Sequence, residues 1–247
     1  MTSSPDSEHL RASLALSCLP GIGAVRFREL VERYGSASAA WQQIVPDSDR
    51  SEALADADRI LEDASRCRAR LLVLGEVGYP EQLLDLRDPP PWLFCVGVSS
   101  AVDLGLVAIV GTRHASVTGL RVAHRLAAGL ARAGIATVSG MARGIDTAVH
   151  WGSLEGGAGT IAVLGCGVDV AYPAANAELR RAIAQGGSLL SEVPCGSAPH
   201  PGAFPRRNRL IAALARAVVV VEAGERSGAL ITAELAAELG RPVAAVP

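Results

Sequence analysis

Short apolar runs alternate with amphipathic stretches through the second part of this 247-residue chain, and this alternation limits the possible folds more than any other feature. From Leu106 onward, an apolar run is followed by a helical pattern five times before the chain ends on PVAAVP. Strands that are apolar on both faces and separated by helices belong to a parallel sheet covered on both sides. We therefore predict an α/β fold, with a Rossmann-like, doubly wound, mainly parallel sheet in residues 71–247.

Each predicted strand is paired with the helix that follows it. The pairs are LVAIVG with 119–133, IATVSG with 145–154, TIAVLG with 176–185, SLLSE with 206–215 and AVVVVE with 229–239. Two shorter runs, LLVLGE and LFCVG, precede them and are predicted to add an edge to the same sheet.

Residues 1–70 are predicted to form a small helical domain. A turn at Pro20–Gly23 separates two helical patterns, and a charged helix is expected over residues 51–71, after a break at Pro46–Ser48. Two helices joined by PGIG resemble a helix-hairpin-helix, whose turn amides hold a DNA phosphate. Because the region is acidic and the motif is short, the plain turn of a helical bundle is the favoured interpretation.

Charge is distributed unevenly along the chain. Residues 1–100 carry 10 Arg against 15 Asp plus Glu, a net −5, whereas residues 101–247 carry 13 Arg against 10, a net +3. Any nucleic-acid surface is therefore expected in the second part. The chain has no lysine, so every strong cationic contact comes from a planar guanidinium.

The cysteine spacing and the first residues of the chain disfavour metal-binding, secreted and membrane-spanning classes of protein. The five cysteines have no CxxC or metal-ligand spacing, and we expect thiols that are mainly buried, with no metal and no cofactor. Residues 1–10 lack a signal-peptide pattern, and no apolar run reaches membrane-spanning length. We expect a cytoplasmic protein without a membrane partner.

Ligands of doubly wound sheets bind outside the carboxyl ends of the strands, so the loops that follow each strand matter most. These loops are Gly111–Ser116, Ser139–Asp146, Gly165–Asp169 and Gly224–Gly228. They are rich in glycine and arginine, but the first is not the GxGxxG fingerprint, and this disfavours an NAD enzyme. Arginines and backbone amides at helix starts favour an extended polyanion as the ligand.

Several residues invite a catalytic interpretation. Asp146 and Glu222 are the carboxylates near strand ends, and an enzyme acting on a nucleotide phosphate is the alternative function that they would serve. Asp146 more often serves the helix dipole in a first turn, and Cys166 is better explained as a small buried residue in a Gly-x-Gly turn. No loop supplies an acid, a base and a nucleophile together, so we expect no catalytic residues. A structural module that uses the acidic helices as a docking face is a third possibility.

Helix boundaries are expected from capping residues. Thr118 is predicted to cap the helix after the first core strand, and Ser227 the last helix. In HPGAFPRRNRLIAAL, Pro205 is expected to stop any preceding element, so that a helix begins at Arg206 or Arg207. On that helix Arg207 falls on the apolar side and Arg209 nearly opposite, toward solvent.

Long motifs in residues 106–247 carry a resemblance to a known family. VAIVGTR, SGMARGID, GTIAVLGCGVDVAYP, FPRRNRLIA and VVVEAGERSGALITAELAAELGRPVAAVP are similar to the pattern of the DNA-processing protein A (DprA/Smf) family. The helical first part resembles that family's small sterile-alpha-motif-like domain. The resemblance implies a non-catalytic protein that binds single-stranded DNA, dimerises through its Rossmann-like domain and loads the RecA recombinase onto incoming DNA during natural transformation.

The resemblance and the loop positions together give the expected DNA-binding residues. They are Gly111, Thr112, Arg113, Ser139, Gly140, Arg143, Gly144, Phe204, Arg206, Arg207, Asn208, Arg209, Ser227 and Gly228. Phe204 would offer a stacking face for a base. The sequence departs from the family pattern at Met141, where a smaller side chain or leucine is usual, and at Ala213 and Ala215, which replace Gly and Ser. It stops at AVP, where the family continues, often into a winged-helix domain.

Overall fold

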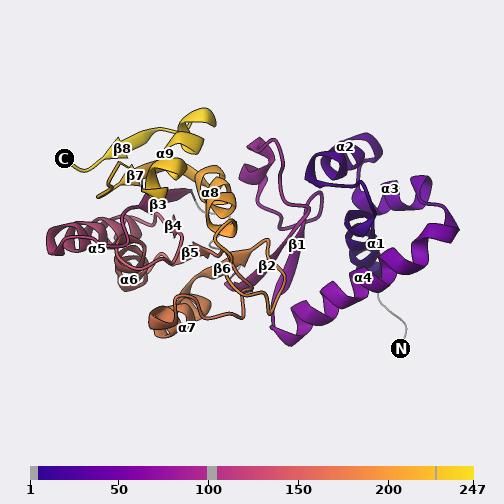
Figure 1. Ribbon diagram of the computed structural model, residues 1–247, viewed down its shortest axis with the longest axis horizontal. Helices are drawn as coiled ribbons and strands as arrows, with labels where there is room; N and C mark the ends of the chain where they lie inside the picture. Colours follow the sequence, from indigo (N-terminus) through magenta and orange to yellow (C-terminus); the bar gives the residue numbers. More distant parts are fainter. Residues whose placement is uncertain (1–4, 99–104, 226) are drawn as a thin grey trace. The chain divides into compact units, whose positions relative to one another are not determined.

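The computed structural model describes residues 5–98, 105–225 and 227–247. Backbone contacts divide the chain into two compact units, Met1–Phe94 and Cys95–Pro247. Figure 1 labels the helices and strands in chain order. The first unit is mainly helical and the second is built on a parallel sheet, so the predicted fold class is confirmed.

The first unit contains the helices α1 (Pro5–Cys18), α2 (Ala24–Tyr34), α3 (Ala37–Ile44) and α4 (Asp47–Arg66). Leu14 and Phe27 are fully buried in its core. The predicted turn between α1 and α2 is present, and the Ile22 N–H donates to the Leu19 carbonyl at 3.1 Å. The start predicted for α4 is wrong: the helix begins at Asp47, because Asp47 and Asp49 place carboxylates at its positive end.

Two short strands follow these helices, as predicted. They are β1 (Arg70–Val73) and β2 (Trp92–Gly97), with the 3₁₀ helix η1 (Glu81–Asp85) between them. Directly after β2, the Val98 N–H donates to the Gly187 carbonyl at 2.8 Å, and the Ser188 hydroxyl donates to the Val98 carbonyl at 2.5 Å.

Six parallel strands form the centre of the second unit, in the order β6-β5-β4-β3-β7-β8. They are β3 (Leu106–Val110), β4 (Thr137–Ser139), β5 (Thr160–Val163), β6 (Ser188–Ser191), β7 (Ala215–Val220) and β8 (Val243–Ala245). The chain starts at β3 and builds outward on one side through β6, then returns to the other side of β3 for β7. The switch point of this doubly wound sheet therefore lies between β3 and β7.

Helices cover both faces of this sheet. The covering helices are α5 (Val117–Arg132), α6 (Ile145–Gly156), α7 (Ala177–Gly186), α8 (Ala203–Leu214) and α9 (Gly228–Glu238). Figure 1 shows α5, α6 and α7 on one face and α8 and α9 on the other. The right-handed connections of parallel strands explain this division, because the chain reverses its direction across the sheet after β6.

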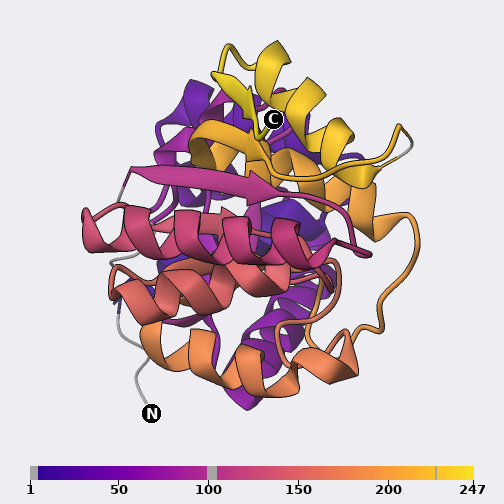
Figure 2. The same ribbon diagram turned by 90° about the vertical axis from the view of Figure 1, so that its left-hand side faces the viewer.

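Small residues let α5 and α6 pack closely, and Figure 2 shows the two helices side by side. A Cβ at Gly152 would overlap the His124 backbone, and one at Gly156 would lie 2.5 Å from the Ala131 side chain. Beneath them Ile109, Ala123 and Val149 are fully buried. Because the chain is poor in aromatic residues, its core is filled by small side chains that let the helix backbones approach closely.

Within the described parts of the chain, no helix combines the length and the apolar character needed to cross a bilayer.

Candidate nucleic-acid interface

The loops after β3, β4 and β7 meet the first turns of α8 and α9 around a hollow of about 780 Å³, which we call the cleft. It lies at the carboxyl ends of the strands, where ligands of such sheets bind. Eight of the fourteen predicted residues line it: Gly111, Thr112, Arg113, Phe204, Arg207, Asn208, Ser227 and Gly228. A neighbouring hollow of about 430 Å³ adds Gly140 and Arg143.

The start predicted for α8 is wrong. The Ala203 N–H already donates to the His200 carbonyl at 2.9 Å, and Pro205 lies within the first helical turn rather than before it. A proline is tolerated there because the first N–H groups of a helix have no acceptor inside the helix. No side chain caps this end, and residues of the first turn of α8 line the cleft.

Arg207 points inward, as predicted, and is only 5% exposed. Its Nη1 donates to the Gly140 carbonyl at 2.7 Å and also to the Val163 carbonyl, which joins the ends of β4 and β5. A Cβ at Gly140 would overlap the guanidinium, so a larger residue there would displace Arg207 from this position. Burial lowers the pKa of Arg207 to about 10, against the opposing effect of the Asp146 carboxylate. The side chain therefore remains a cation at neutral pH.

The prediction that Arg209 faces solvent is wrong, because Arg209 is 8% exposed. Its Nη2 contacts Glu192 Oε2 at 2.5 Å, and Arg206 Nε contacts Glu192 Oε1 at 3.2 Å. The helix face opposite Arg207 is covered by the loop after β6, which carries Glu192. Neither Arg206 nor Arg209 lines the two hollows, and the two arginines share the Glu192 carboxylate.

Phe204 has two partners in the cleft. The guanidinium carbon of Arg113 lies 5.4 Å from the centre of its ring, within cation–π range. The Tyr172 ring lies 5.6 Å from it, centre to centre, at 31°. Tyr172 is 39% exposed and lines both hollows, but sequence reasoning did not select it. The signal was its place in the loop after β5, at the same edge of the sheet.

Side-chain hydrogen bonds fix the loop between β4 and α6. Asp146 Oδ2 accepts from the Ala142 N–H at 3.1 Å, and the Thr147 hydroxyl donates to the Ala142 carbonyl at 2.7 Å. Asn176 Nδ2 donates to the Met141 carbonyl at 3.0 Å and to Thr147 Oγ1 at 2.9 Å. Met141 has a φ of 56°, a conformation that non-glycine residues adopt only when the surroundings hold it. Asn176 and Thr147, which were not predicted, supply that support.

Asp146 serves this loop and does not have the features of a free catalytic carboxylate. Burial raises its pKa, while Arg207, the Ala142 and Gly140 amides and the Ser139 hydroxyl act in the opposite direction. The favoured interpretation of a first-turn acidic residue agrees with this position. Arg143, on the same loop, is exposed.

Three of the predicted residues position the loops through close contacts. A Cβ at Gly111 would lie 2.5 Å from Ile145 Cγ1, and one at Gly144, where φ is 78°, would overlap the Thr112 carbonyl. Ser139 is fully buried and its hydroxyl donates to a main-chain oxygen of β3 at 2.7 Å. Ser139 therefore supports the strand ends and does not reach a ligand.

The cap predicted for α5 is wrong: Ser116, not Thr118, accepts from the Gly119 N–H, at 2.9 Å. The Glu222 carboxylate, from the loop after β7, accepts from the Ser116 N–H at 3.1 Å and from its hydroxyl at 2.8 Å. The Glu222 carbonyl accepts from the Thr112 N–H at 2.7 Å. Sequence reasoning missed this role, because the partners are 106 residues apart. Both candidate carboxylates are thus committed to protein hydrogen bonds.

The cap predicted for α9 is confirmed. The Ser227 hydroxyl accepts from the Ala229 N–H at 3.3 Å, and Asn208 Nδ2 on α8 donates to the Gly228 carbonyl at 3.1 Å. This hydrogen bond links the first turns of α8 and α9 beside the cleft. Arg226, on the same loop, lies outside the described residues.

Cys95, Cys166 and Cys195 are buried, whereas Cys18 and Cys67 are partly exposed. Burial raises the pKa of the Cys166 thiol, which agrees with the predicted inert role.

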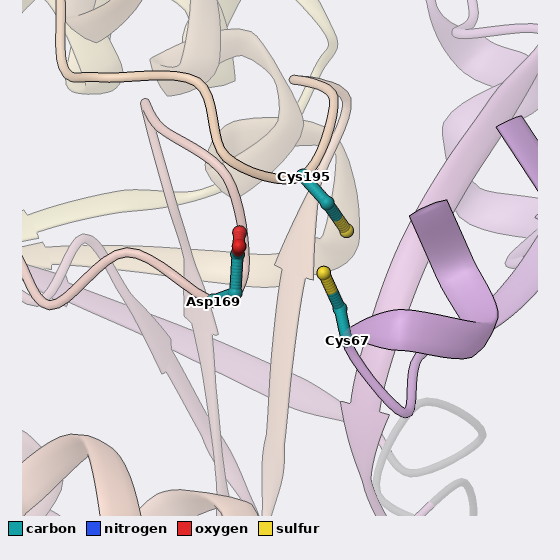
Figure 3. Close-up of side chains that lie close together, drawn as sticks. All are labelled: Cys67, Asp169 and Cys195. Atoms are coloured by element: carbon teal, nitrogen blue, oxygen red, sulfur yellow. The ribbon is translucent and has the colours of Figure 1, made fainter. Parts of the chain in front are cut away.

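The loops that follow β5 and β6 are joined near the cleft. The Asp169 carboxylate accepts from the Gly196 N–H at 2.8 Å. The Gly167 N–H donates to the Ser197 carbonyl at 3.0 Å. Figure 3 shows Asp169 and Cys195 on these two loops, and also labels Cys67 of the first unit.

Comparisons with known proteins show to which family the chain is related. The model of the family described as DNA recombination-mediator protein A matches residues 70–247. Protein Smf of Synechocystis is 36% identical over 258 residues, which cover 95% of this chain and 63% of that protein. DNA processing protein DprA of Streptococcus pneumoniae is 44% identical over 169 residues, 68% of this chain and 60% of that protein. The chain thus matches less than two thirds of the length of these curated relatives.

Two solved structures are also similar. DNA processing protein A from Streptococcus pneumoniae has a TM-score of 0.78 and 31% identity, covering 100% of this chain and 88% of that one. DNA processing protein A from Helicobacter pylori, studied for its single-stranded DNA binding mode, has a TM-score of 0.67 and 34% identity, covering 73% of this chain and 82% of that one. Since the family model covers more than half of the chain, including every loop around the cleft, this chain belongs to the DNA recombination-mediator protein A family.

Proposed function

We propose that this chain binds single-stranded DNA independently of sequence, in the cleft, and that residues 71–247 carry the binding site. We further propose that it catalyses no reaction and acts in the cytoplasm as a homodimer that loads RecA onto incoming DNA during natural transformation.

The observation that carries the DNA-binding proposal is the grouping of Arg113, Phe204 and Tyr172 at the uncapped start of α8. Single strands are held by a cationic groove that follows the backbone and by aromatic rings on which bases stack. The cleft has both, with Arg207 as a second cation in its wall. A stacking ring takes any base, because every base has a π-face, so binding is expected to ignore sequence.

Relatives support the same ligand. The Helicobacter pylori structure concerns single-stranded DNA binding by a protein 34% identical to this chain. The Streptococcus pneumoniae relative, 44% identical to this chain over 169 residues, is named DNA processing protein DprA. The roles in RecA loading and dimerisation rest on the family resemblance.

The carboxylates favour binding over catalysis. Glu222 accepts hydrogen bonds at the start of α5, and Asp146 is buried against main-chain donors and Arg207. A general base must be within hydrogen-bond reach of the proton that it abstracts. Both carboxylates thus accept hydrogen bonds that hold loop geometry, which supports a binding role for the cleft.

Fluorescence anisotropy of labelled oligo-dT, titrated with the full chain at several salt concentrations, tests the binding proposal. We expect binding at low salt that weakens steeply as salt rises, and Arg113→Ala should lower the slope of log K against log salt by about 0.7, one phosphate contact. Arg181→Ala, an exposed arginine on α7, is the control. Absence of binding at low salt, or binding insensitive to salt, would refute the proposal.

RecA loading and self-association need their own measurements. RecA filament formation on a labelled single strand should be faster with the chain than without it. Sedimentation analysis should show a dimer. A monomer at all concentrations, or an unchanged RecA rate, would refute these two parts and leave DNA binding intact.

A further inference from the structure

A third hollow, of about 650 Å³, lies against the first turns of α5 and α6, and we call it the α5 groove. Three arginines and two histidines line it, and none of the lining residues is acidic. The five are Arg113, His114, Arg121, His124 and Arg125; the others are Ala115, Leu120, Gly144, Thr147 and Ala148. A concave surface with this lining attracts an anion.

The two arginines of α5 lack protein partners. Arg121 and Arg125 are exposed, lie one helical turn apart, and make no ion pair or hydrogen bond within the ranges that the structure describes. Helix α5 has no acidic residue. Glu155 of α6 contacts His124 Nε2 at 3.2 Å and Arg132 Nη2 at 3.9 Å, so it is committed to other cations.

Six arginines on the helices of the first unit, by contrast, contact carboxylates: Arg11 with Asp58, Arg26 with Glu29, Arg28 with Glu32, Arg50 with Asp47, Arg59 with Asp56 and Arg66 with Asp63. The α5 groove has no carboxylate in its lining, and no carboxylate pairs with its two arginines on α5, so it is suited to an external anion.

The α5 groove adjoins the cleft. Arg113 and His114 line both, so this short segment forms their shared wall. We infer that a single strand seated in the cleft continues over this wall into the α5 groove, where its phosphates contact Arg121 and Arg125. This inference rests on the proposed function. It gives the bound DNA a second contact region, on the other side of the loop after β3.

The size of the effect follows from counterion release. For single strands, each phosphate contact adds about 0.7 to the salt slope, which at 0.1 M salt is a factor of about 5 in affinity. Loss of two contacts should therefore weaken binding about 25-fold and lower the slope by about 1.4. A strand too short to leave the cleft should show neither effect.

The experiment compares two labelled oligo-dT strands, of about 4 and about 16 nucleotides, the span of known single-strand site sizes. The parent chain is measured beside the double variant Arg121→Ala/Arg125→Ala. A charge-matched control, Arg132→Ala/Arg181→Ala, removes two exposed arginines that do not line the α5 groove. Thermal melts confirm that both variants are folded.

We expect the double variant to lose about 25-fold in affinity for the long strand only, with the control close to the parent. Unchanged long-strand binding, equal losses for both strands, or an equal loss in the control would overturn the inference while leaving the cleft proposal standing. If the parent binds neither strand, the proposed function itself fails, and the inference with it.

Discussion

Among substitutions of the arginines of α8, Arg207→Ala should cause the largest losses of stability and of DNA affinity. The substitution leaves the Gly140 and Val163 carbonyls without their donor and the buried Asp146 carboxylate without its nearest cation. Removing one partner of a buried charged network costs about 3–5 kcal/mol of unfolding free energy. At about 2–4 °C per kcal/mol for a chain of this size, the melting temperature should fall by roughly 6–20 °C.

Arg209→Ala is the matched comparison. It also removes a buried guanidinium, but Glu192 keeps its contact with Arg206, so a smaller cost of about 1–3 kcal/mol is expected. Arg209 does not line the cleft, whereas Arg207 does. In anisotropy titrations at temperatures where both variants are folded, Arg207→Ala should weaken oligo-dT binding at least about 5-fold at 0.1 M salt, and Arg209→Ala much less.

Arg207→Lys separates charge from geometry. A lysine keeps the cation but offers a compact ammonium in place of the planar fork, so stability and affinity should lie between those of the parent and the alanine variant. The reasoning is refuted by equal affinity losses for Arg207→Ala and Arg209→Ala. It is refuted equally by an Arg207→Ala melting temperature no lower than that of Arg181→Ala, a surface control.

Three further outcomes are expected. Burial lowers the pKa of His150 from 6.5 to about 3, so as the pH falls between these values only the unfolded chain takes up the proton, and the folded state loses stability. Between pH 7 and pH 5, the unfolding free energy measured in urea should fall by about 2 kcal/mol less in His150→Gln than in the parent. An equal fall in both proteins contradicts the burial argument. Gly144→Ala should lower the unfolding free energy by about 1–3 kcal/mol, because an alanine is strained at the positive φ of this position. Gly129→Ala, where the side chain would enter open space on α5, should be neutral or stabilising. Similar thermal melts for both variants would exclude strain in the loop. Tyr172→Ala should weaken oligo-dT binding by about 1–3 kcal/mol in anisotropy titrations with an unchanged salt slope, since stacking releases no counterion; a changed slope would exclude stacking.

The strands and helices of the second unit could be predicted because their signals are local. The runs that became β3 to β8 are mainly apolar, and each of β3 to β7 is followed by a stretch with helical periodicity. Strand order was not predictable in this way. The placement of β7 beside β3 depends on pairings between Val107 and Ala217, and between Ile109 and Val219, which no local pattern specifies.

The structure brings ten of the fourteen expected residues to the cleft and its neighbouring hollow, while several expected details were wrong. The inward direction of Arg207 followed from helical geometry, because the helix phase survives an error in the starting residue. The direction of Arg209 failed because the same geometry assumed water on the far side, where Glu192 lies instead. Ser116 was missed as a cap because its role depends on Glu222, far along the chain.

The contact between Ser116 and Glu222 has a consequence for the order of folding. β3 lies at the centre of the sheet, yet its partner β7 is made about a hundred residues later on the ribosome. Until that strand arrives, the start of α5 lacks its carboxylate and the Thr112 amide lacks its acceptor. We therefore expect the loop after β3 to reach its native geometry late, because non-local pairings form after local ones. A chain that ends before residue 215 would contain most of the cleft's residues without the geometry that β7 gives to this loop.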